Sequence, residues 1–164
     1  MQENPFVQPH EYWMRFALRE AERAFEADEV PIGCVIVKDG AIIGRGYNQT
    51  ETLNDPTAHA EIIAVTAACA TVGEKLLTGA TVYATLEPCP MCAGSLVLAR
   101  PDRLIFGAYD PKAGACGTLY TITEDDRLNH RIMTLGGILD QECGMILKEY
   151  FSTKRAKNKK PLND

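Results

Sequence analysis

The sequence predicts an α/β fold, with a mixed five-stranded sheet between helices in three α/β/α layers. Apolar, β-branched segments alternate along the chain with segments whose apolar residues recur at helical spacing. Such alternation is typical of a sheet covered by helices on both faces. Asp39-Gly40, a dipeptide typical of tight hairpins, separates the first two strand-like segments and makes the sheet mixed. With 164 residues, 46% of them hydrophobic, the chain suits one domain with a substantial core.

The first elements are expected to be a helix and a hairpin. Residues 11–27 repeat apolar side chains every three or four positions, which indicates an amphipathic helix. Residues 31–38 (PIGCVIVK) are apolar and β-branched and predict a buried strand, and residues 41–47 predict its hairpin partner.

A second helix is expected after a polar, turn-rich segment at residues 48–57. Asp55-Pro56 suits a helix N-cap followed by proline at the first helical position. The alanine-rich residues 58–71 then predict a helix, which Gly73 closes.

The remaining elements continue the alternation. The sequence predicts a strand at 81–86, a helix at 90–99, a strand at 103–108, a short fifth strand at 137–140 and a last helix at 143–151. A loop rich in glycine and alanine lies around residues 114–117.

The charge distribution separates a body from a C-terminal tail. The net charge is −5, yet residues 148–164 hold six basic and two acidic residues. We therefore expect a single domain over residues 1–153 and a flexible basic tail over residues 154–164. A basic tail on an acidic body can meet an RNA backbone locally, or it is a solvated terminus.

Composition also bears on location. No stretch approaches the ~20 apolar residues that a membrane span needs, and residues 1–10 lack the basic and apolar regions of a secretory signal. Six cysteines in such a chain favour thiols or metal ligands over disulfides. We expect a cytoplasmic protein with no membrane partner.

Two short segments carry the candidate chemistry. His59 precedes Glu61 by two residues, and Cys89 and Cys92 stand three apart at a predicted strand-to-helix junction. One imidazole and two thiolates suit Zn²⁺, and three protein ligands leave the fourth tetrahedral position for water, as in catalytic zinc sites. The sequence predicts one Zn²⁺ per chain, held by His59, Cys89 and Cys92.

Glu61 is the candidate catalytic residue. On a regular helix its side chain would point away from that of His59, so the two converge only if the metal lies over the helix end. There Glu61 can take a proton from the zinc-activated water and pass it to the ring and then to the departing amine.

Simpler interpretations exist for each segment alone. Cys89 and Cys92 also fit a thiol redox pair or half of a structural zinc site. His59 and Glu61 also fit a surface pair. No second Cys-x-x-Cys exists to close a structural site, and Cys34, Cys69, Cys116 and Cys143 are isolated.

The combination of His-x-Glu with Pro-Cys-x-x-Cys is the signature of the zinc deaminases, and the chain resembles the bacterial tRNA-specific adenosine deaminases along most of its length. The matching stretches are residues 10–15, 29–33, 55–61, 85–89, 91–94, 106–108 and 129–131. The resemblance implies a cytidine-deaminase-like fold, a homodimer, and hydrolysis of adenosine to inosine at the wobble position of a tRNA anticodon stem-loop.

The resemblance also carries over a set of substrate contacts: Val30, Asn48, Ala58, Pro88, Asp110, Lys112, Phe151, Lys154 and Arg155. The residue types suit these roles. The Asn48 amide can donate and accept at a base edge, Asp110 can accept from a ribose 2′-hydroxyl, and Phe151 can stack on a base beside the phosphate-binding Lys154 and Arg155. Without the resemblance, Asn48 and Asp110 equally suit turns, and Val30 suits a strand core.

Two other functions fit the metal segments. One is a deaminase of a free base or nucleotide, of the guanine or cytosine type. The other is a non-catalytic zinc-containing RNA-binding subunit.

The acidic residues Glu124, Asp125 and Asp126 depart from the basic segment expected in the family.

Overall fold

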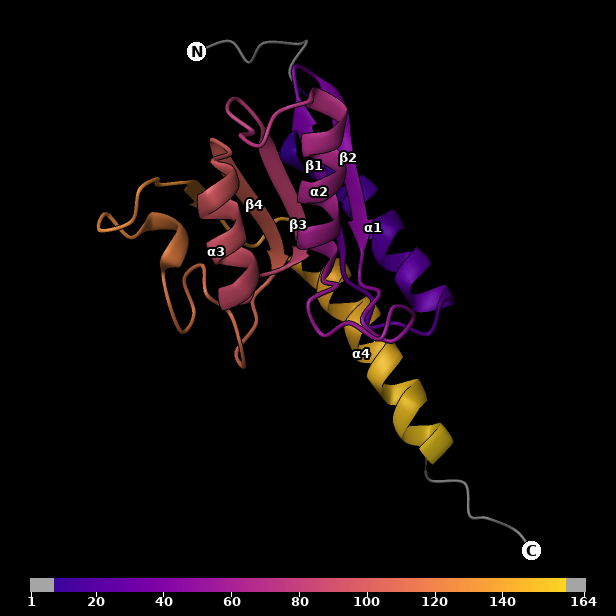
Figure 1. Cartoon of the computed structure of the whole chain (residues 1–164). Coiled ribbons are helices and arrows are strands. Elements are labelled where there is room, and N and C mark those ends of the chain that lie inside the picture. The colour runs from indigo at the N-terminus through magenta and orange to yellow at the C-terminus, as the bar shows by residue number, and fades with distance from the viewer. Residues whose placement is uncertain (1–7, 159–164) are drawn as a thin grey trace, which may run out of the picture.

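A computed structural model describes residues 8–158 and confirms the predicted mixed five-stranded sheet between helices (Figure 1). The elements follow in the order α1 (His10–Glu26), β1 (Gly33–Lys38), β2 (Ala41–Tyr47), α2 (Ala60–Val72), β3 (Thr81–Leu86), α3 (Pro90–Ala99), β4 (Arg103–Ala108), the 3₁₀-helix η1 (Ile122–Glu124), β5 (Met133–Leu135) and α4 (Asp140–Asn158). No helix within the described residues is both long and apolar enough to cross a membrane.

The sheet gathers the ends of several strands at one edge. Its strand order is β2-β1-β3-β4-β5. Strand β1 is antiparallel to both β2 and β3, while β3, β4 and β5 are parallel. The carboxyl ends of β2, β3 and β4 and the amino end of β1 therefore lie together at one end of the sheet, which we call the strand-end edge. Figure 1 shows the loops of that edge at the lower end of the sheet, next to α4.

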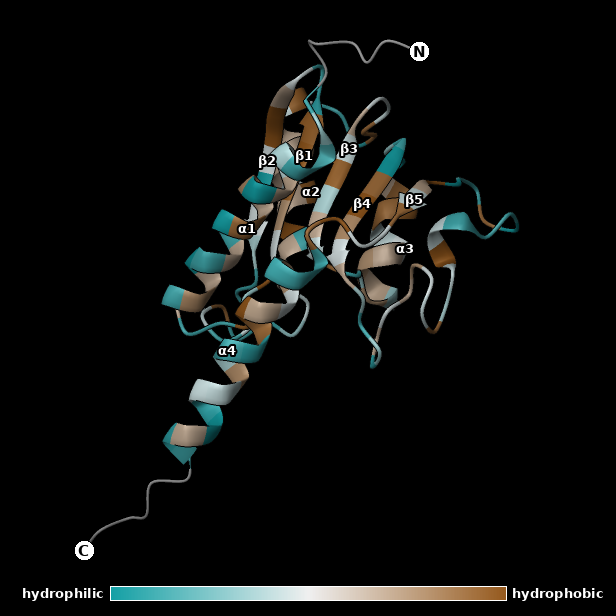
Figure 2. Cartoon of the chain, turned by 180° about the vertical axis from the view of Figure 1, so that it is seen from behind, coloured by the Kyte–Doolittle hydropathy of each residue, from teal (hydrophilic) through white to brown (hydrophobic). Residues whose placement is uncertain are grey.

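Two layers of helices bury the two faces of the sheet. Helices α2 and α3 pack on one face, around Leu96, Leu104 and Phe106. Helices α1 and α4 pack on the other face, around Met14, Tyr83 and Cys143. In Figure 2, which views the molecule from the opposite side, α1 and the start of α4 lie in front of the apolar strands, and hydrophilic residues follow α1.

Glycines on the edge strand β2 let α2 lie unusually close to the sheet. A Cβ built at Gly46 would lie 2.2 Å from the carbonyl oxygen of Ala60, and one at Gly44 would lie 2.4 Å from that of Ala64. Only glycine allows this approach, which brings the N-terminal end of α2 against the strands.

The predicted start of α2 was wrong. The helix begins at Ala60 with His59 as its N-cap, instead of beginning after an Asp55 cap. The Asp55 carboxylate accepts hydrogen bonds from the Thr57 amide (2.8 Å) and hydroxyl (2.7 Å). Aspartate closes such local turns readily, so Asp55 shapes the loop before the helix.

The predicted fifth strand and last helix were also misplaced. The strand is Met133–Leu135, and residues 137–140 turn into α4, with Gly137 and Leu139 at positive φ (91° and 55°). Helix α4 is longer than predicted at both ends and runs to Asn158. The predicted boundary at residue 154 therefore falls inside this helix, and only residues 159–164 of the predicted tail lie outside the described residues.

Contacts with the end of α1 explain why α4 continues. The Tyr150 ring packs edge-on against Phe25, and its hydroxyl donates to the carbonyl oxygen of Asp28 (2.9 Å). Lys154 Nζ lies 2.6 Å from Asp28 Oδ2. These contacts hold the later turns of α4, which contain no glycine or proline to end the helix.

Candidate metal centre and substrate pocket

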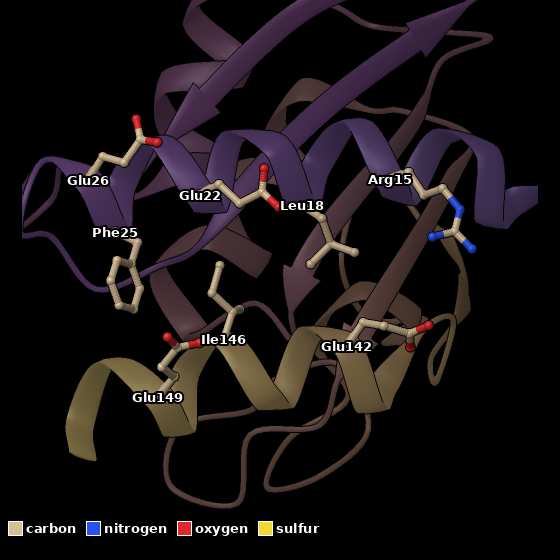
Figure 3. Close-up of a pocket in the computed structure, with 8 residues that line it drawn as sticks. All are labelled: Arg15, Leu18, Glu22, Phe25, Glu26, Glu142, Ile146 and Glu149. Carbon is tan, nitrogen blue, oxygen red and sulfur yellow. The ribbon is translucent and has the colours of Figure 1, made fainter. Parts of the chain in front are cut away.

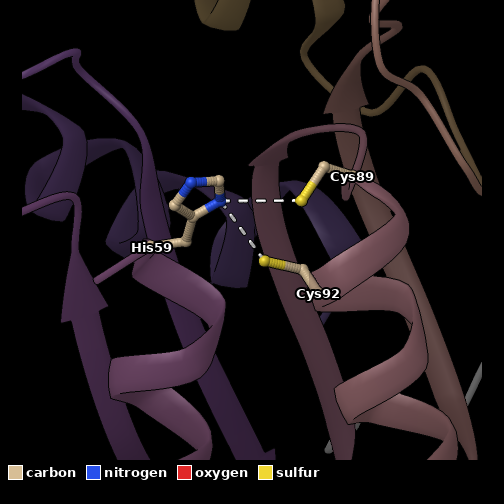
Figure 4. Close-up of side chains that lie close together, drawn as sticks. All are labelled: His59, Cys89 and Cys92. Carbon is tan, nitrogen blue, oxygen red and sulfur yellow. Dashed lines mark hydrogen bonds between the residues drawn. The ribbon is translucent and has the colours of Figure 1, made fainter. Parts of the chain in front are cut away.

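Three predicted ligands meet between two helix starts. His59 is the N-cap of α2, Cys89 is the N-cap of α3, and Cys92 lies in the first turn of α3. Their ligand atoms all lie within 4.8 Å of one another. The Nδ1 atom of His59 is 3.6 Å from Cys89 Sγ and 3.5 Å from Cys92 Sγ (Figure 4). Within residues 8–158 this is the only such cluster.

Local backbone geometry places the two sulfurs. Strand β3 ends at Leu86, Cys89 is extended (φ −71°, ψ 173°), and Pro90 starts α3 with a ring suited to the first helical position. Residues three apart on a helix share a face, so Cys92 turns toward the same point as Cys89. Hydrogen bonds from Cys92 and His59 lower the pKa of Cys89 to about 4, against the opposing effect of burial.

The donor set and its spacing fit zinc. A tetrahedral Zn²⁺ with Zn–S bonds of ~2.3 Å and Zn–N bonds of ~2.0–2.1 Å separates nitrogen from sulfur by roughly 3.6 Å. The nitrogen-to-sulfur distances of 3.6 and 3.5 Å match this value. Two thiolates would also balance the charge of the ion.

Glu61 lies beside this cluster and is buried, with only 4% of its surface exposed. Cys92 Sγ donates to Glu61 Oε2 at 3.4 Å. Because His59 is an extended cap outside the helix, the expected opposition of residues 59 and 61 does not arise. Burial raises the pKa of Glu61 above its ordinary value, which makes its carboxylate a better proton acceptor.

Two predicted contacts are next to a metal ligand in the sequence, and a third, Asn48, precedes Gln49, whose amide bonds to one of them. Asn48 follows β2 and is buried, and its Oδ1 has no hydrogen-bond partner among the described residues. Ala58, next to His59, accepts from the Gln49 amide (3.0 Å). Pro88, next to Cys89, accepts from the Ala115 amide (2.9 Å).

Five other predicted contacts line one hollow of about 670 Å³ at the same edge of the sheet. They are Val30, Asp110, Lys112, Phe151 and Arg155, and Tyr109, Leu147 and Lys148 line it with them. We call this cavity the strand-end hollow. Lys154 does not line it, because its ammonium group is paired with Asp28 on the other side of α4.

A second hollow, of about 520 Å³, lies between α1 and α4 (Figure 3). Leu18, Phe25 and Ile146 line it, together with four glutamates and Arg15. None of the predicted site residues belongs to it. We call it the inter-helix groove.

Sequence reasoning assigned no role to two buried glutamates near the site, Glu29 and Glu87. Each accepts hydrogen bonds from the backbone of a loop at the strand-end edge. Only Glu87 has a signal in the sequence, which is an acidic residue directly before a proline, in Leu86-Glu87-Pro88. A charged residue in such a setting is buried only with partners.

The fold and the three-ligand site define a class, the zinc-binding deaminases. The family model of the cytidine and deoxycytidylate deaminase zinc-binding region matches residues 7–108, which contain all three ligands and Glu61. The tRNA-specific adenosine deaminase of Bacillus subtilis (strain 168) is 46% identical over 149 residues, which cover 91% of this chain and 92% of that protein.

Solved structures agree with this class. One comes from biochemical and structural studies of A-to-I editing by tRNA:A34 deaminases at the wobble position of transfer RNA. It is 45% identical, with a TM-score of 0.80 over 83% of this chain and 99% of its own. The guanine deaminase of Bacillus subtilis is 32% identical, with a TM-score of 0.61 over 96% of this chain and 98% of its own. The chain belongs to the family of tRNA-specific adenosine deaminases, and Zn²⁺ is its cofactor, with one site per chain.

Proposed function

We propose that this chain hydrolyses adenosine to inosine at the wobble position of a tRNA anticodon stem-loop. One observation carries the proposal: a buried carboxylate, Glu61, touches the zinc ligands at the same edge of the sheet as a hollow lined by basic and aromatic residues. The family to which the chain belongs supports the same substrate.

The reaction consumes one water molecule and releases ammonia. The chemistry that zinc supplies when bound is Lewis acidity, which lowers the pKa of a water molecule to about 7. Glu61 accepts the proton of the attacking water and delivers it to N1 of the adenine ring. Glu61 then takes a second proton from the hydroxyl group added at C6 and transfers it to the departing amine, so that ammonia leaves and a carbonyl group remains at C6.

Residues around the metal are proposed to hold the base. The Asn48 amide, whose buried Oδ1 has no partner within residues 8–158, can accept a hydrogen bond at the base edge while its NH₂ group donates another. An unpaired buried oxygen is costly, so a base that satisfies it is favoured. Val30, Ala58 and Pro88 supply apolar wall around the ring.

The strand-end hollow is proposed to take the RNA flanking the base. Phe151 is half-exposed and can stack on an unpaired base, while Lys112 and Arg155 suit phosphates. Asp110 Oδ1 accepts from the Lys112 and Ala113 amides, which leaves Oδ2 for a ribose 2′-hydroxyl. Lys154 joins this contact only by leaving Asp28.

A homodimer is proposed to form over the outer face of α3. Leu98 is 76% exposed there, beside a hollow of about 560 Å³ lined by Ile62, Met91, Val97 and Leu128 among others. Covering this apolar surface with a second copy is favourable.

The free thiols suit the proposed cytoplasmic location.

The experiment is a comparison of substrates. A tRNA pool is sequenced before and after incubation with the zinc-loaded protein, and ammonia release from free guanine is measured in parallel. We expect A-to-G changes confined to anticodon wobble positions and no turnover of guanine. The 32% identical guanine deaminase makes guanine the second candidate. Turnover of guanine with unchanged tRNA would replace the proposal by that one.

A further inference from the structure

The loop of residues 109–118, which follows β4, folds around a single buried carboxylate. Glu87 comes directly after β3 and has 1% of its surface exposed. Its Oε2 accepts from the Asp110 amide (3.0 Å), and its Oε1 accepts from the amides of Cys116 (3.1 Å) and Thr118 (2.9 Å). The Thr118 hydroxyl donates to Oε2 as well.

The loop is shaped to enclose this side chain. A Cβ built at Gly114 would lie 2.3 Å from Glu87 Oε2, so only glycine leaves room for the carboxylate. The Gly114 amide donates to the carbonyl oxygen of Asp110 (3.0 Å), which closes the first turn of the loop. A buried carboxylate requires donors, and within the described residues all of its donors come from this one loop.

The same segment joins the loop to the metal centre. The Glu87 amide donates to the carbonyl oxygen of Ala108 (2.8 Å), and the Ala115 amide donates to that of Pro88 (2.9 Å). Cys89 is the next residue along the chain. The distance between the metal and the loop therefore depends on how Glu87 and Pro88 hold residues 108–118.

Asp110 is the residue whose place this arrangement sets. Its amide is bound by Glu87, and its Oδ1 accepts from the amides of Lys112 (2.9 Å) and Ala113 (3.3 Å). Backbone and side chain are thus both fixed, at the wall of the strand-end hollow. Glu87 itself does not line that hollow.

We propose that Glu87 is a positioning residue for RNA recognition, because it fixes the 109–118 loop and so aims Asp110 at the substrate without touching it. This inference rests on the proposed function, which supplies the RNA. It assigns Glu87 to substrate binding, and neither to proton transfer nor to the metal.

The test uses the zinc-loaded full chain with Glu87→Gln, which keeps the size of the side chain but replaces one acceptor oxygen by a donor. The substrate is an unmodified anticodon stem-loop with adenosine at the wobble position. We expect KM to rise about 10-fold while kcat changes by less than about 3-fold. Amide hydrogen exchange at Asp110, Cys116 and Thr118 should accelerate about 10-fold or more. Zinc content should stay at one per chain.

A double-mutant cycle separates positioning from a general structural role. If Glu87 acts through Asp110, adding Glu87→Gln to Asp110→Ala should raise KM no further than the stronger single variant does. Additive effects would overturn the proposal. Glu20→Gln is the matched control, because Glu20 is another buried glutamate but its partners are Arg23 and Arg45, away from this loop. Its KM should equal that of the wild type.

Thr118→Val covers the case in which Glu87→Gln does not fold, since Thr118 is exposed and its hydroxyl donates to Glu87. We expect a KM increase of about 3-fold. Loss of zinc from Glu87→Gln with an unchanged KM for Thr118→Val would overturn the proposal. If the wild type makes no inosine, the proposed function fails, and amide exchange in the free protein still decides whether Glu87 holds the loop.

Discussion

Helix α4 lines two hollows of comparable volume, the inter-helix groove of about 520 Å³ and the strand-end hollow of about 670 Å³. The side turned to α1 contributes Glu142, Ile146 and Glu149, as Figure 3 shows. The other side contributes Leu147, Lys148, Phe151 and Arg155. The helix thus presents negative charge to one hollow and positive charge with an aromatic ring to the other.

The difference teaches that shape does not identify a substrate site in this fold. The inter-helix groove would repel a phosphate backbone with its four glutamates. The strand-end hollow lies where loops from β1, β3 and β4 converge, at the edge that also holds the zinc ligands. Carboxyl ends of strands are common places for ligands in α/β folds, because loops from neighbouring strands meet there.

The largest expected effect comes from removing a zinc ligand at that edge. Cys92→Ser should lose zinc and reduce inosine formation to background, because two ligands no longer hold the ion. Elemental analysis and a tRNA deamination assay measure both quantities. Cys69→Ser, which changes a thiol further along α2, is the control and should keep one zinc per chain. Full activity of Cys92→Ser would contradict the metal assignment.

The next effect concerns proton transfer. Glu61→Gln should lower kcat about 10²–10⁴-fold while zinc stays bound, because the amide cannot carry the proton from water to the base. Single-turnover rates with the stem-loop, together with zinc content, check this expectation. Normal turnover by this variant would remove Glu61 from the mechanism.

A charge reversal in each hollow tests the comparison directly. Arg155→Glu should raise KM for tRNA about 10-fold and reduce the slope of binding against salt by about one counterion, as expected for a lost phosphate contact. Glu149→Lys, on the opposite side of the same helix, should leave KM within about 2-fold. Steady-state kinetics at several salt concentrations measure both variants. If the Glu149 variant changes KM more than the Arg155 variant does, the RNA binds in the inter-helix groove, and its proposed place in the strand-end hollow is wrong.

The smallest effect concerns acid stability on the Asn48 side of the site. Burial raises the pKa of Glu29, but hydrogen bonds from Thr52, Glu51 and Thr50 outweigh it and hold the pKa below 4.5. A carboxyl with a depressed pKa stabilises the fold above pH 4.5, and this contribution disappears as the pH falls through the folded-state pKa.

Glu29→Gln should therefore be less stable than the wild type at pH 7, by about 1–3 kcal/mol, and the difference should shrink as the pH falls below 4.5. Denaturant unfolding between pH 7 and pH 3.5 measures it. The zinc ligands titrate in both proteins, so the difference between them isolates Glu29. A constant difference across this range would show that Glu29 contributes by packing alone.

Elements with strong local signals were predicted well. The Asp39-Gly40 turn has positive φ at both residues (51° and 72°), as its sequence implies, and the strand that follows has the predicted bounds. Pro90 fixes the start of α3. The zinc ligands were predictable for the same reason, because Cys89 and Cys92 are three residues apart at a helix start and their side chains therefore point in the same direction.

Features that depend on distant partners were not predictable. Strand β5 has three residues, too few for alternation to show, and it exists because it pairs with β4. The end of α4 depends on the contacts of Tyr150 and Lys154 with Asp28, more than 120 residues earlier. The role of Glu87 depends on backbone amides that lie 23 to 31 positions away.

The two glycines of β2 allow the close packing of α2 on this edge strand, and this packing affects the affinity of the site for zinc. Metal–ligand bonds tolerate errors of only about 0.2 Å, and any side chain at residue 46 would displace the first turn of α2 by more than that. His59, which caps this turn, would move with it, so its distance from the sulfurs of Cys89 and Cys92 would change. An engineer who wants to weaken zinc retention without altering a ligand should therefore begin at the outermost strand.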